Sequence, residues 1–457
     1  MLERRPRSDY ARPLDDEHSD ERNRTLLQMV TRPYPVLVVG SGAREHALVW
    51  ALAQSPSVSE VWAAPGNPGI AKLAGIADIP VTDVEAIAEW ADGHGIGLVV
   101  VGPEAPLAMG IADLLRARGI PEFGPSRAAA ELEWSKSFAK DFMRRHGIPT
   151  APYGVFTEID AALDFIRATS VPLVVKADGL AAGKGVIICG TAAEAASAVR
   201  SVLVEREFQT AGDRVVIEEF LEGEELSVIA VVDGERLAIL PPARDYKRLR
   251  DGNLGPNTGG MGSYAPVGDL DPDLLAHVRE MVLEPAVAGL RSEGRPYHGA
   301  LYAGLMLTSD GPMVLEFNCR FGDPETQAIL PLLDLDLADL LLSCAEGRLA
   351  SERIATRPGA AVCVVLAANG YPERPGGGDA IEGIEDALRS GAFVFQGGTA
   401  LSAGQLVTNG GRVLSVVGTG ADQIEATTRA YAAADIIQFD GKQMRRDIAM
   451  SLAPQPA

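Results

Sequence analysis

Short apolar runs alternate with amphipathic stretches from residue 34 onward. Runs at 36–40, 61–64 and 98–102 are rich in apolar and β-branched residues, and helical patterns at 46–53 and 84–91 separate them. Strands that alternate with helices at this spacing predict a parallel sheet with helical crossovers. Each run ends in Gly or Pro-Gly, so we expect ligands at the carboxyl ends of the strands.

The pattern changes after residue 124. Residues 124–149 predict a helix, and residues 172–189 predict a strand, a glycine-rich loop and a second strand. A helix over 192–204 and strands at 214–220 and 225–234 complete a small α+β unit. Residues 244–262 lack periodicity and are rich in Gly, Asn and Pro, which predicts a binding loop.

The last part of the chain predicts a further α+β unit. Glycine runs at 376–378 and 410–411 are typical of hairpin turns. The remaining predicted elements are a helix over 274–290, a hairpin of 301–307 with 313–318, strands at 361–367, 405–408 and 413–418, and a helix near 421–435.

Composition narrows the classes of function. Apolar residues make up 47% of the chain and charged residues 23%, which is typical of a globular protein. The net charge of −21 disfavours non-specific binding of nucleic acid. Four scattered cysteines predict reduced thiols in a cytoplasmic protein, and no apolar run is long enough to span a membrane. Residues 1–33 carry seven Arg and seven acidic residues, and we interpret them as a disordered extension.

The first candidate site is the loop GSGAREHA at 40–47. It follows a strand and opens a helix, so its backbone N–H groups can bind a phosphate, with Arg44 as a further contact. A tight turn with a surface salt bridge is the alternative. A dinucleotide fingerprint is disfavoured because Glu45 holds the third glycine position and Pro65-Gly66-Asn67 follows the next strand in place of an acid.

The second candidate is the run from Lys176 to Gly185. Three glycines and two lysines between two strands suit a flap that binds polyphosphate, whereas a surface hairpin with solvated lysines is the alternative. Lys176 favours the flap, because it lies in an apolar strand where an unpaired charge is costly. No Walker motif is present, since no Ser or Thr follows Lys184.

Two acidic segments are further candidates. The run 217–227 joins two strands and could bind adenine and ribose, or be an acidic turn. In the run 314–327, Glu316 and Asn318 lie two apart in a strand and share a face, while Leu315 and Phe317 are expected to face the core. A carboxylate beside a carboxamide oxygen suits Mg²⁺ or Mn²⁺, and a solvated strand face is the alternative.

Together these segments resemble the glycinamide ribonucleotide synthetase family of the ATP-grasp superfamily. The matching strings follow the family's order over about residues 36–447. They are GSGAREHAL, APGNPG, VGPEAPL, SKSFAKDFMRRHGIPTA, KADGLAAGKGV, IEEFLEGEELS, GPNTGGMGSY, LYAGLM, EFNCRFGDPETQ and VTNGGRVL.

The resemblance implies an α/β and α+β multidomain fold. Residues 34–134 would be a parallel α/β domain that binds phosphoribosylamine. Residues 135–358 would be the ATP-grasp core with a lid at about 154–221, and residues 359–457 a C-terminal α+β domain. The implied reaction joins glycine to 5-phosphoribosylamine through glycyl phosphate and uses ATP and Mg²⁺ or Mn²⁺. A cytoplasmic monomer or homodimer that binds neither nucleic acid nor membrane is expected.

The resemblance also assigns roles by matching motif, with no nucleophilic side chain required and Arg320 as the candidate catalytic residue. The ATP-binding residues would be Lys136, Lys176, Gly179, Gly183, Lys184, Gly185, Glu218, Glu219, Leu221 and Glu225. The metal ligands would be Glu316 and Asn318. The substrate-binding residues would be Gly40, Gly42, Arg44, Glu45, Pro65, Gly66, Asn67, Asn257, Thr258, Gly259, Gly260, Met261, Arg320 and Asp323.

Three positions depart from the family's pattern. Ala43 and Trp134 replace glycines, which bears on local backbone geometry, and Tyr246 replaces the histidine of a D-H-K-R string, so no proton transfer is assigned there. Two other classes are weighed against this assignment: an ATP-grasp ligase with another substrate, and a dinucleotide-binding dehydrogenase.

Overall fold

The structure, a computed structural model, describes residues 33–179, 185–205, 212–268 and 270–450. The extension expected at residues 1–33 lies outside these ranges, apart from Pro33. Gly183 and Lys184 of the expected flap also lie outside them.

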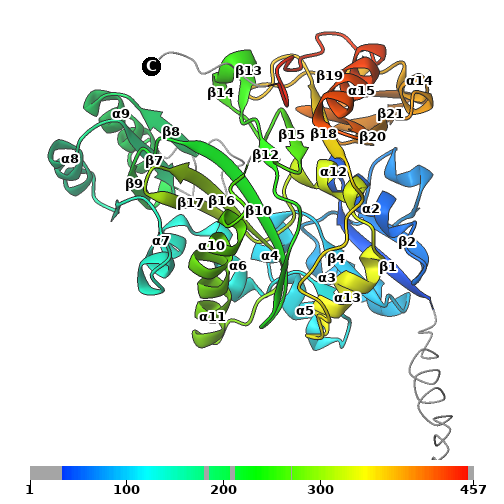
Figure 1. Ribbon diagram of the computed structural model, residues 1–457, viewed down its shortest axis with the longest axis horizontal. Helices are drawn as coiled ribbons and strands as arrows, with labels where there is room; N and C mark the ends of the chain where they lie inside the picture. The colour runs from blue at the N-terminus through cyan, green and yellow to red at the C-terminus, as the bar shows by residue number, and fades with distance from the viewer. Residues whose placement is uncertain (1–32, 180–184, 206–211, 269, 451–457) are drawn as a thin grey trace, which may run out of the picture. The chain divides into compact units, whose positions relative to one another are not determined.

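The first sheet has five strands, and all of its pairings are parallel. Its strand order is β3-β2-β1-β4-β5 (Figure 1), so the chain changes its direction of winding between β1 and β4. This confirms the predicted parallel sheet and directs the loops after β1 and β4 into the crevice where such sheets bind ligands. Its elements are β1 (Tyr34–Gly40), α2 (Ala43–Leu52), β2 (Val58–Pro65), β3 (Gly75–Ile76), α3 (Val84–Gly93), β4 (Leu98–Val101), α4 (Glu104–Ala108), α5 (Ile111–Ala117) and β5 (Glu122–Phe123).

The helix expected over 124–149 is two helices, so that prediction is wrong. Ser135 adopts an extended conformation (φ −120°, ψ 107°), and its hydroxyl accepts a hydrogen bond from the N–H of Phe138. Ser135 thus ends one helix and caps the next. The two helices are α6 (Arg127–Trp134) and α7 (Lys136–Arg145).

A separate four-stranded antiparallel sheet follows, in the order β6-β9-β7-β8. Helices α8 and α9 pack on each other and on this sheet, and together they enclose a hydrophobic core of their own. The elements are β6 (Tyr153–Phe156), α8 (Ile159–Ala168), β7 (Leu173–Ala177), β8 (Val186–Cys189), α9 (Ala192–Leu203) and β9 (Val215–Glu219).

A second antiparallel sheet, named the central sheet here, has the order β11-β10-β16-β17. A turn of π-helix at Arg279–Leu283 joins α10 to α11, so the predicted helix continues in this form. The elements are β10 (Glu224–Asp233), β11 (Leu237–Ile239), α10 (Leu274–Val278), α11 (Glu284–Ser292), β16 (His298–Thr308), β17 (Gly311–Asn318), α12 (Glu325–Ile329) and α13 (Leu337–Ala345).

The pairing of β16 with β17 contains a β-bulge. Gly304 pairs with Glu316 whereas Leu305 pairs with Val314, which leaves Leu315 as the extra residue. The expectation that Leu315 faces the core is therefore wrong: the bulge interrupts the alternation, and Leu315 lines a cleft.

The C-terminal segment builds two sheets, in the orders β12-β15-β18-β23-β20 and β19-β22-β21. Residues 244–262, expected to be a loop, supply β12 to the first of these, form the hairpin β13-β14 and end at the first residue of β15. The elements are β12 (Arg244–Asp245), β13 (Arg248–Arg250), β14 (Leu254–Asn257), β15 (Gly262–Ala265), β18 (Ala360–Ala367), β19 (Gly377–Ala380), α14 (Ile384–Arg389), β20 (Phe393–Gln396), β21 (Thr399–Ser402), β22 (Gln405–Asn409), β23 (Arg412–Gly420) and α15 (Gln423–Ile436).

Neither predicted glycine turn closes a hairpin. Gly377 and Gly378 lie within β19, and Gly410-Gly411 links β22 to β23, which belong to different sheets. A Cβ atom on Gly410 would lie 2.9 Å from the Cα of Gly398. Glycine is needed there because two backbone segments cross closely.

Candidate active site

The loop after β1 is stabilised by a buried glutamate. The carboxylate of Glu45 accepts a hydrogen bond from the N–H of Gly42 at 2.6 Å and forms an ion pair with Arg44 at 2.6 Å. A Cβ atom on Gly40 or Gly102 would lie within 2.3 Å of Glu45 side-chain atoms, so the glycines enclose this carboxylate. Glu45 and Gly40 thus give the loop its shape, and their contact with substrate stays a prediction.

Asn67 joins three parts of the chain. Its amide nitrogen donates to the carbonyls of Ser41 and Gln396 at 2.8 and 2.7 Å, and its oxygen accepts from the N–H groups of Gly69 and Ile70, both at 2.9 Å. These bonds use the full capacity of the side chain. Asn67 can therefore offer a ligand only its backbone.

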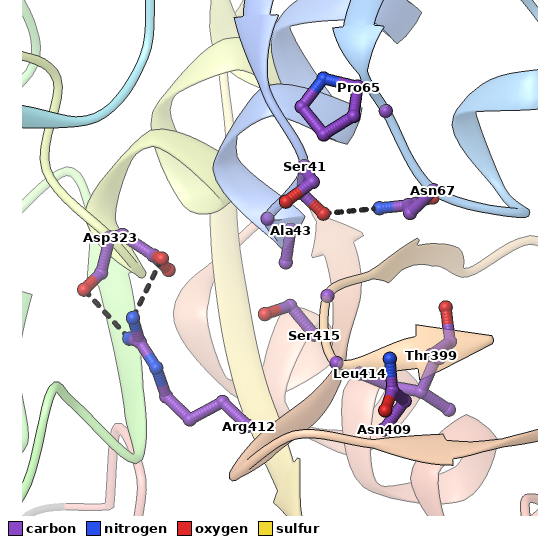
Figure 2. A pocket seen from close by; sticks show the side chains of 14 residues that line it. Ser41, Ala43, Pro65, Asn67, Asp323, Thr399, Asn409, Arg412, Leu414 and Ser415 are labelled. Atoms are coloured by element: carbon purple, nitrogen blue, oxygen red, sulfur yellow. Dashed lines mark hydrogen bonds and ion pairs between the residues drawn. The ribbon is translucent and has the colours of Figure 1, made fainter. Parts of the chain in front are cut away.

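A pocket of about 370 Å³ opens at the N-terminus of α2 (Figure 2). The expected residues Gly42, Pro65, Gly66 and Asn67 line it from one side. A helix N-terminus in a pocket of this kind favours an anion such as phosphate. The opposite side, which the sequence did not predict, comes from the C-terminal segment and comprises Gly397, Gly398, Thr399, Asn409, Arg412, Leu414 and Ser415.

A histidine fixes the two sides of this pocket to each other. Nδ1 of His46 accepts a hydrogen bond from the N–H of Gln396 at 2.8 Å, and the ring lies edge-on to Phe395 with centroids 5.6 Å apart. Burial, and then the charge of Lys72, lower the pKa of His46 from 6.5 to about 4. The ring is neutral at pH 7, as an acceptor at Nδ1 requires.

A larger cleft of about 1470 Å³ lies between the β6-β9-β7-β8 sheet and the central sheet. Most of the expected ATP, metal and glycine residues line it, although Gly260 and Met261 do not. Met261 is fully buried, and Gly260 packs on Pro324. Those that line it are Lys136, Lys176, Gly179, Gly185, Glu218, Glu219, Leu221, Glu225, Asn257, Thr258, Gly259, Glu316, Asn318, Arg320 and Asp323. Arg44, which was expected at phosphoribosylamine, also lines this cleft.

Three lysines from α7 and β7 lie at this cleft. Lys136 donates to the carbonyl of Gly179 at 2.9 Å, and Lys176 donates to the carbonyl of Leu315 at 3.1 Å. Lys140, which the sequence did not single out, pairs with Glu218, as does Lys176. Glu218 was expected at the adenine, but its side chain is engaged by the two lysines. Lys140 lies four residues after Lys136, on the same face of α7, and this spacing was the signal from which it could have been predicted.

Glu316 and Asn318 both reach the cleft from β17, as their spacing predicted. Nζ of Lys247 lies 2.8 Å from Glu225 and 3.6 Å from Glu316. Burial alone would raise the pKa of Glu316, but Lys247, Lys176 and Lys136 hold this pKa below its usual value. An ionised carboxylate beside a carboxamide oxygen fits a divalent cation that takes its other ligands from phosphate and water.

No cluster of three or more His, Cys, Asp or Glu side chains that could hold a metal ion is found among the described residues. A cation here would depend on the bound nucleotide for the rest of its ligands. In the same described ranges, no helix is both long and apolar enough to cross a membrane.

Arg320 follows the two candidate metal ligands and lies between two glutamates. Its Nε is 3.2 Å from Glu133 and 3.7 Å from Glu104, and its Nη2 donates to Oδ1 of Asn318 at 3.4 Å. Burial alone would raise the pKa of Glu104, but the charges of Arg320 and Arg44 hold it below its usual value. The guanidinium is therefore fixed at the edge of the cleft.

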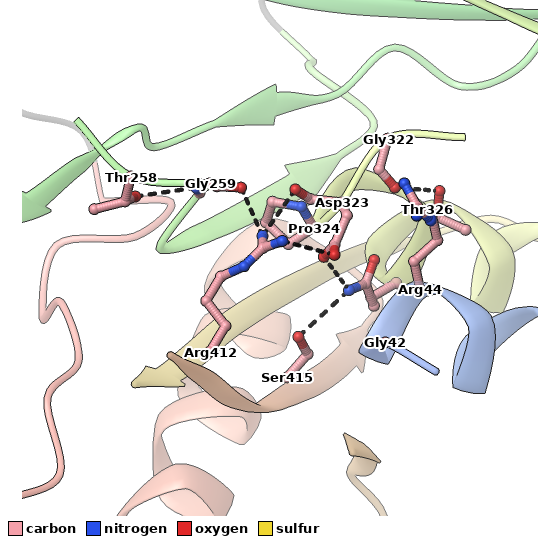
Figure 3. A network of polar contacts seen from close by, with 12 residues as sticks. Gly42, Arg44, Thr258, Gly259, Gly322, Asp323, Pro324, Thr326, Arg412 and Ser415 are labelled. Atoms are coloured by element: carbon pink, nitrogen blue, oxygen red, sulfur yellow. Dashed lines mark hydrogen bonds and ion pairs between the residues drawn. The ribbon is translucent and has the colours of Figure 1, made fainter. Parts of the chain in front are cut away.

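A polar network joins the cleft to the smaller pocket (Figure 3). The guanidinium of Arg412 donates to the carboxylate of Asp323 at 2.7 Å and to the carbonyl of Gly259 at 2.6 Å. Asp323 also accepts from Gln327 at 2.7 Å. Asp323 and Arg412 line both cavities. Arg412 was not predicted as a site residue, because the TNGGR string was interpreted only as a turn.

Tyr246 anchors the loop that carries Lys247. Its hydroxyl accepts a hydrogen bond from the N–H of Ala449 at 3.0 Å, and the guanidinium of Arg445 lies 4.7 Å from the ring centroid. Burial raises the pKa of Tyr246 to about 12. The phenol is therefore neutral at pH 7 and anchored to the end of the described chain.

Three family models match the chain. They are described as phosphoribosylglycinamide synthetase, N domain (residues 34–133), ATP-grasp (A) domain (residues 134–326) and C domain (residues 361–451). These matches confirm the multidomain fold class predicted from the sequence.

Curated relatives agree with the family models. The chain is 50% identical over 416 residues to a phosphoribosylamine–glycine ligase of Allochromatium vinosum, covering 90% of this chain and 97% of the relative. It is 51% identical over 417 residues to the trifunctional purine biosynthetic protein adenosine-3 of Gallus gallus, covering 90% of this chain and 42% of that protein.

Solved structures give the same result for the fold. The crystal structure of phosphoribosylamine–glycine ligase from Thermotoga maritima has a TM-score of 0.81 and 39% identity, and the match covers 90% of this chain and 99% of that one. A biotin carboxylase domain from Hydrogenobacter thermophilus, solved with MgADP, has a TM-score of 0.69 at 18% identity over 90% of this chain and 91% of that one. The second likeness concerns the fold alone.

Proposed function

Because the chain belongs to the phosphoribosylglycinamide synthetase family and is a ligase that uses ATP in purine biosynthesis, we propose that its other substrates are glycine and 5-phosphoribosylamine. One observation carries this proposal. The anion pocket at α2 and the large cleft share Asp323 and Arg412. An amine held in the pocket can therefore meet a carboxylate activated in the cleft.

The cleft suits ATP in charge and position. Lys136 and Lys176 would bind the phosphates, with Gly179 and Gly185 at the two described ends of the flap. The backbone of Glu219 and Leu221 would contact adenine, and Glu225 the ribose. Glu218 would act indirectly, since its carboxylate is already paired with lysines.

Glu316 and Asn318 would hold Mg²⁺ or Mn²⁺ together with the phosphates of ATP. The bound cation would supply charge neutralisation at the phosphate groups. The chain's own cations add to this, because Arg320 and Lys247 lie on either side of the two ligands. A carboxylate must approach a triphosphate, and such fixed charges lower the repulsion between them.

The phosphate of phosphoribosylamine would lie at the N-terminus of α2, against the backbone of Gly42, Gly66 and Asn67. Glycine would lie near Arg320, Asp323 and the loop 257–259. ATP would phosphorylate the glycine carboxylate, and the amine would attack the resulting glycyl phosphate, releasing phosphate. The side chains bind and orient the reactants, which is sufficient to accelerate such a transfer. As the resemblance implies, we also propose a cytoplasmic location and a monomeric or homodimeric assembly.

The test is the release of ADP and phosphate by the purified protein. We expect it to require ATP, a divalent cation, glycine and freshly prepared phosphoribosylamine together, and to yield glycinamide ribonucleotide. Release with another acid and amine in place of these two would contradict the proposed substrates and favour a different ATP-grasp ligase. Turnover of a nicotinamide cofactor would favour the dehydrogenase alternative.

A further inference from the structure

In the large cleft, one carboxylate lies between two ammonium groups. Glu218 on β9 pairs through Oε2 with Lys140 of α7 and through Oε1 with Lys176 of β7. The exposed fractions of Lys140, Lys176 and Glu218 are 3%, 6% and 2%. Three ionised groups of this kind carry a net charge of +1 in a region largely shielded from water.

Lys140 has two further partners, which fix its ammonium group. It donates to Oγ1 of Thr150 at 2.7 Å and lies 3.5 Å from the carbonyl of Ala151. Thr150 in turn donates to the carbonyl of Val314 in β17 at 2.7 Å. Lys140 is thus held beside the segment that joins α7 to β6, and it keeps one oxygen of Glu218 occupied.

We propose that Lys140 is a positioning residue for nucleotide binding: its ammonium neutralises half of the Glu218 carboxylate and thereby leaves Lys176 a positive charge for the triphosphate. The inference deepens the proposed function and rests on it, because Lys176 is the residue placed at the phosphates there. Without Lys140, Glu218 and Lys176 would form a neutral pair, and the nucleotide would have to compete with Glu218 for Lys176.

The net charge of the cluster gives a distinctive test. It is +1 in the native chain, zero in Lys140→Met, and +1 again in the double variant Lys140→Met/Glu218→Gln. A neighbouring charge at this range changes the affinity for an ion by about tenfold or more. Lys140→Met should therefore bind nucleotide at least about tenfold more weakly, and the double variant should recover most of that loss.

The measurement is calorimetric titration of the full chain with the magnesium complex of a non-hydrolysable ATP analogue. Lys176→Met is the matched positive control, and the KM for glycine should stay unchanged in Lys140→Met. Unchanged nucleotide affinity in Lys140→Met, or a double variant as weak as the single one, would overturn the inference alone. Failure of the native chain to bind the analogue would overturn the proposed function as well.

A second measurement does not depend on the folding of Lys140→Met. Burial lowers the pKa of Lys140 to about 8. The charge of Glu218 opposes this shift, and the charge of Lys176 adds to it. Tyr153 is a further titratable group that faces Lys140 within the described part of the chain, with its ring centroid 5.6 Å from Nζ. The native affinity for the analogue should fall more steeply from pH 7 to pH 9 than that of Lys140→Arg, because arginine stays charged. Burial also lowers the pKa of Lys136, but this residue is the same in both proteins. Identical pH dependence in both proteins would overturn the inference.

Discussion

Protonation of His46 should weaken the attachment of the C-terminal sheets to the first domain. The imidazole is 7% exposed and accepts the N–H of Gln396 through Nδ1. A proton on that nitrogen would remove the hydrogen bond and place an unpaired charge against Phe395. Because protonation is unfavourable in this environment, the pKa of His46 is lowered to about 4, and burial is the main cause of the shift.

The sign and the size of the effect follow from the two pKa values of His46. In the unfolded chain the pKa is 6.5 and in the folded chain about 4, so between these values the unfolded chain binds more protons. Stability is therefore lost as the pH falls through this window. The full gap corresponds to about 3 kcal/mol, and about 2 kcal/mol of it is lost by pH 5.

The assay is urea unfolding of the native chain and of His46→Asn at pH 7.5, 6.0 and 5.0. Asparagine can accept the same N–H but does not titrate. A difference measurement is needed because burial raises the pKa of Glu122 to about 7, which acts in the opposite direction over the same range. We expect the native chain to lose about 2 kcal/mol relative to the variant between pH 7.5 and pH 5. A constant difference across the three pH values would refute the reasoning.

Three further predictions concern the site. Glu316→Gln should lower turnover at saturating Mg²⁺ by about 10²-fold or more while leaving the unfolding midpoint unchanged; near-native turnover would contradict the metal assignment. Gly102→Ala should cost about 1–3 kcal/mol in urea unfolding, because its Cβ would lie 2.1 Å from Glu45. Gly93→Ala, whose Cβ would meet nothing within 4 Å, is the control, and equal stability of the two variants would argue against the enclosed carboxylate. Arg412→Gln should raise the KM for phosphoribosylamine roughly ten- to hundredfold, as loss of a charged hydrogen bond predicts, and should spare the KM for ATP; the reverse pattern in steady-state kinetics would place Arg412 in the nucleotide site instead.

Local hydrophobic patterns were sufficient to predict elements that are long and whose partners are near in the sequence. The strands β1 and β4 are continuous apolar runs, and both were predicted, as was the side of β17 that carries Glu316 and Asn318. The bulge at Leu315 was not predictable, because it depends on the pairing with β16 rather than on the alternation in its own strand.

Other features were not predicted from the sequence because they depend on contacts between distant segments. β15 has only four residues, and it pairs with β18 almost a hundred residues later. No local periodicity marks such a strand. Arg412 was missed as a site residue for the same reason, since its partner Asp323 lies 89 positions away in the sequence. For Glu218, the sequence located the segment but could not reveal that two lysines engage its side chain.

The two walls of the anion pocket come from opposite ends of the chain, with residues 41–67 on one side and 397–415 on the other. During synthesis the first wall leaves the ribosome more than 300 residues before the second. A chain released early, even one that already contains the cleft's lysines and the candidate metal ligands Glu316 and Asn318, has no enclosed place for the phosphorylated amine. Because residues 397–415 are synthesised late, the pocket for the phosphorylated amine is the last part of the site to form. Only a chain translated beyond this segment can bring activated glycine to the amine.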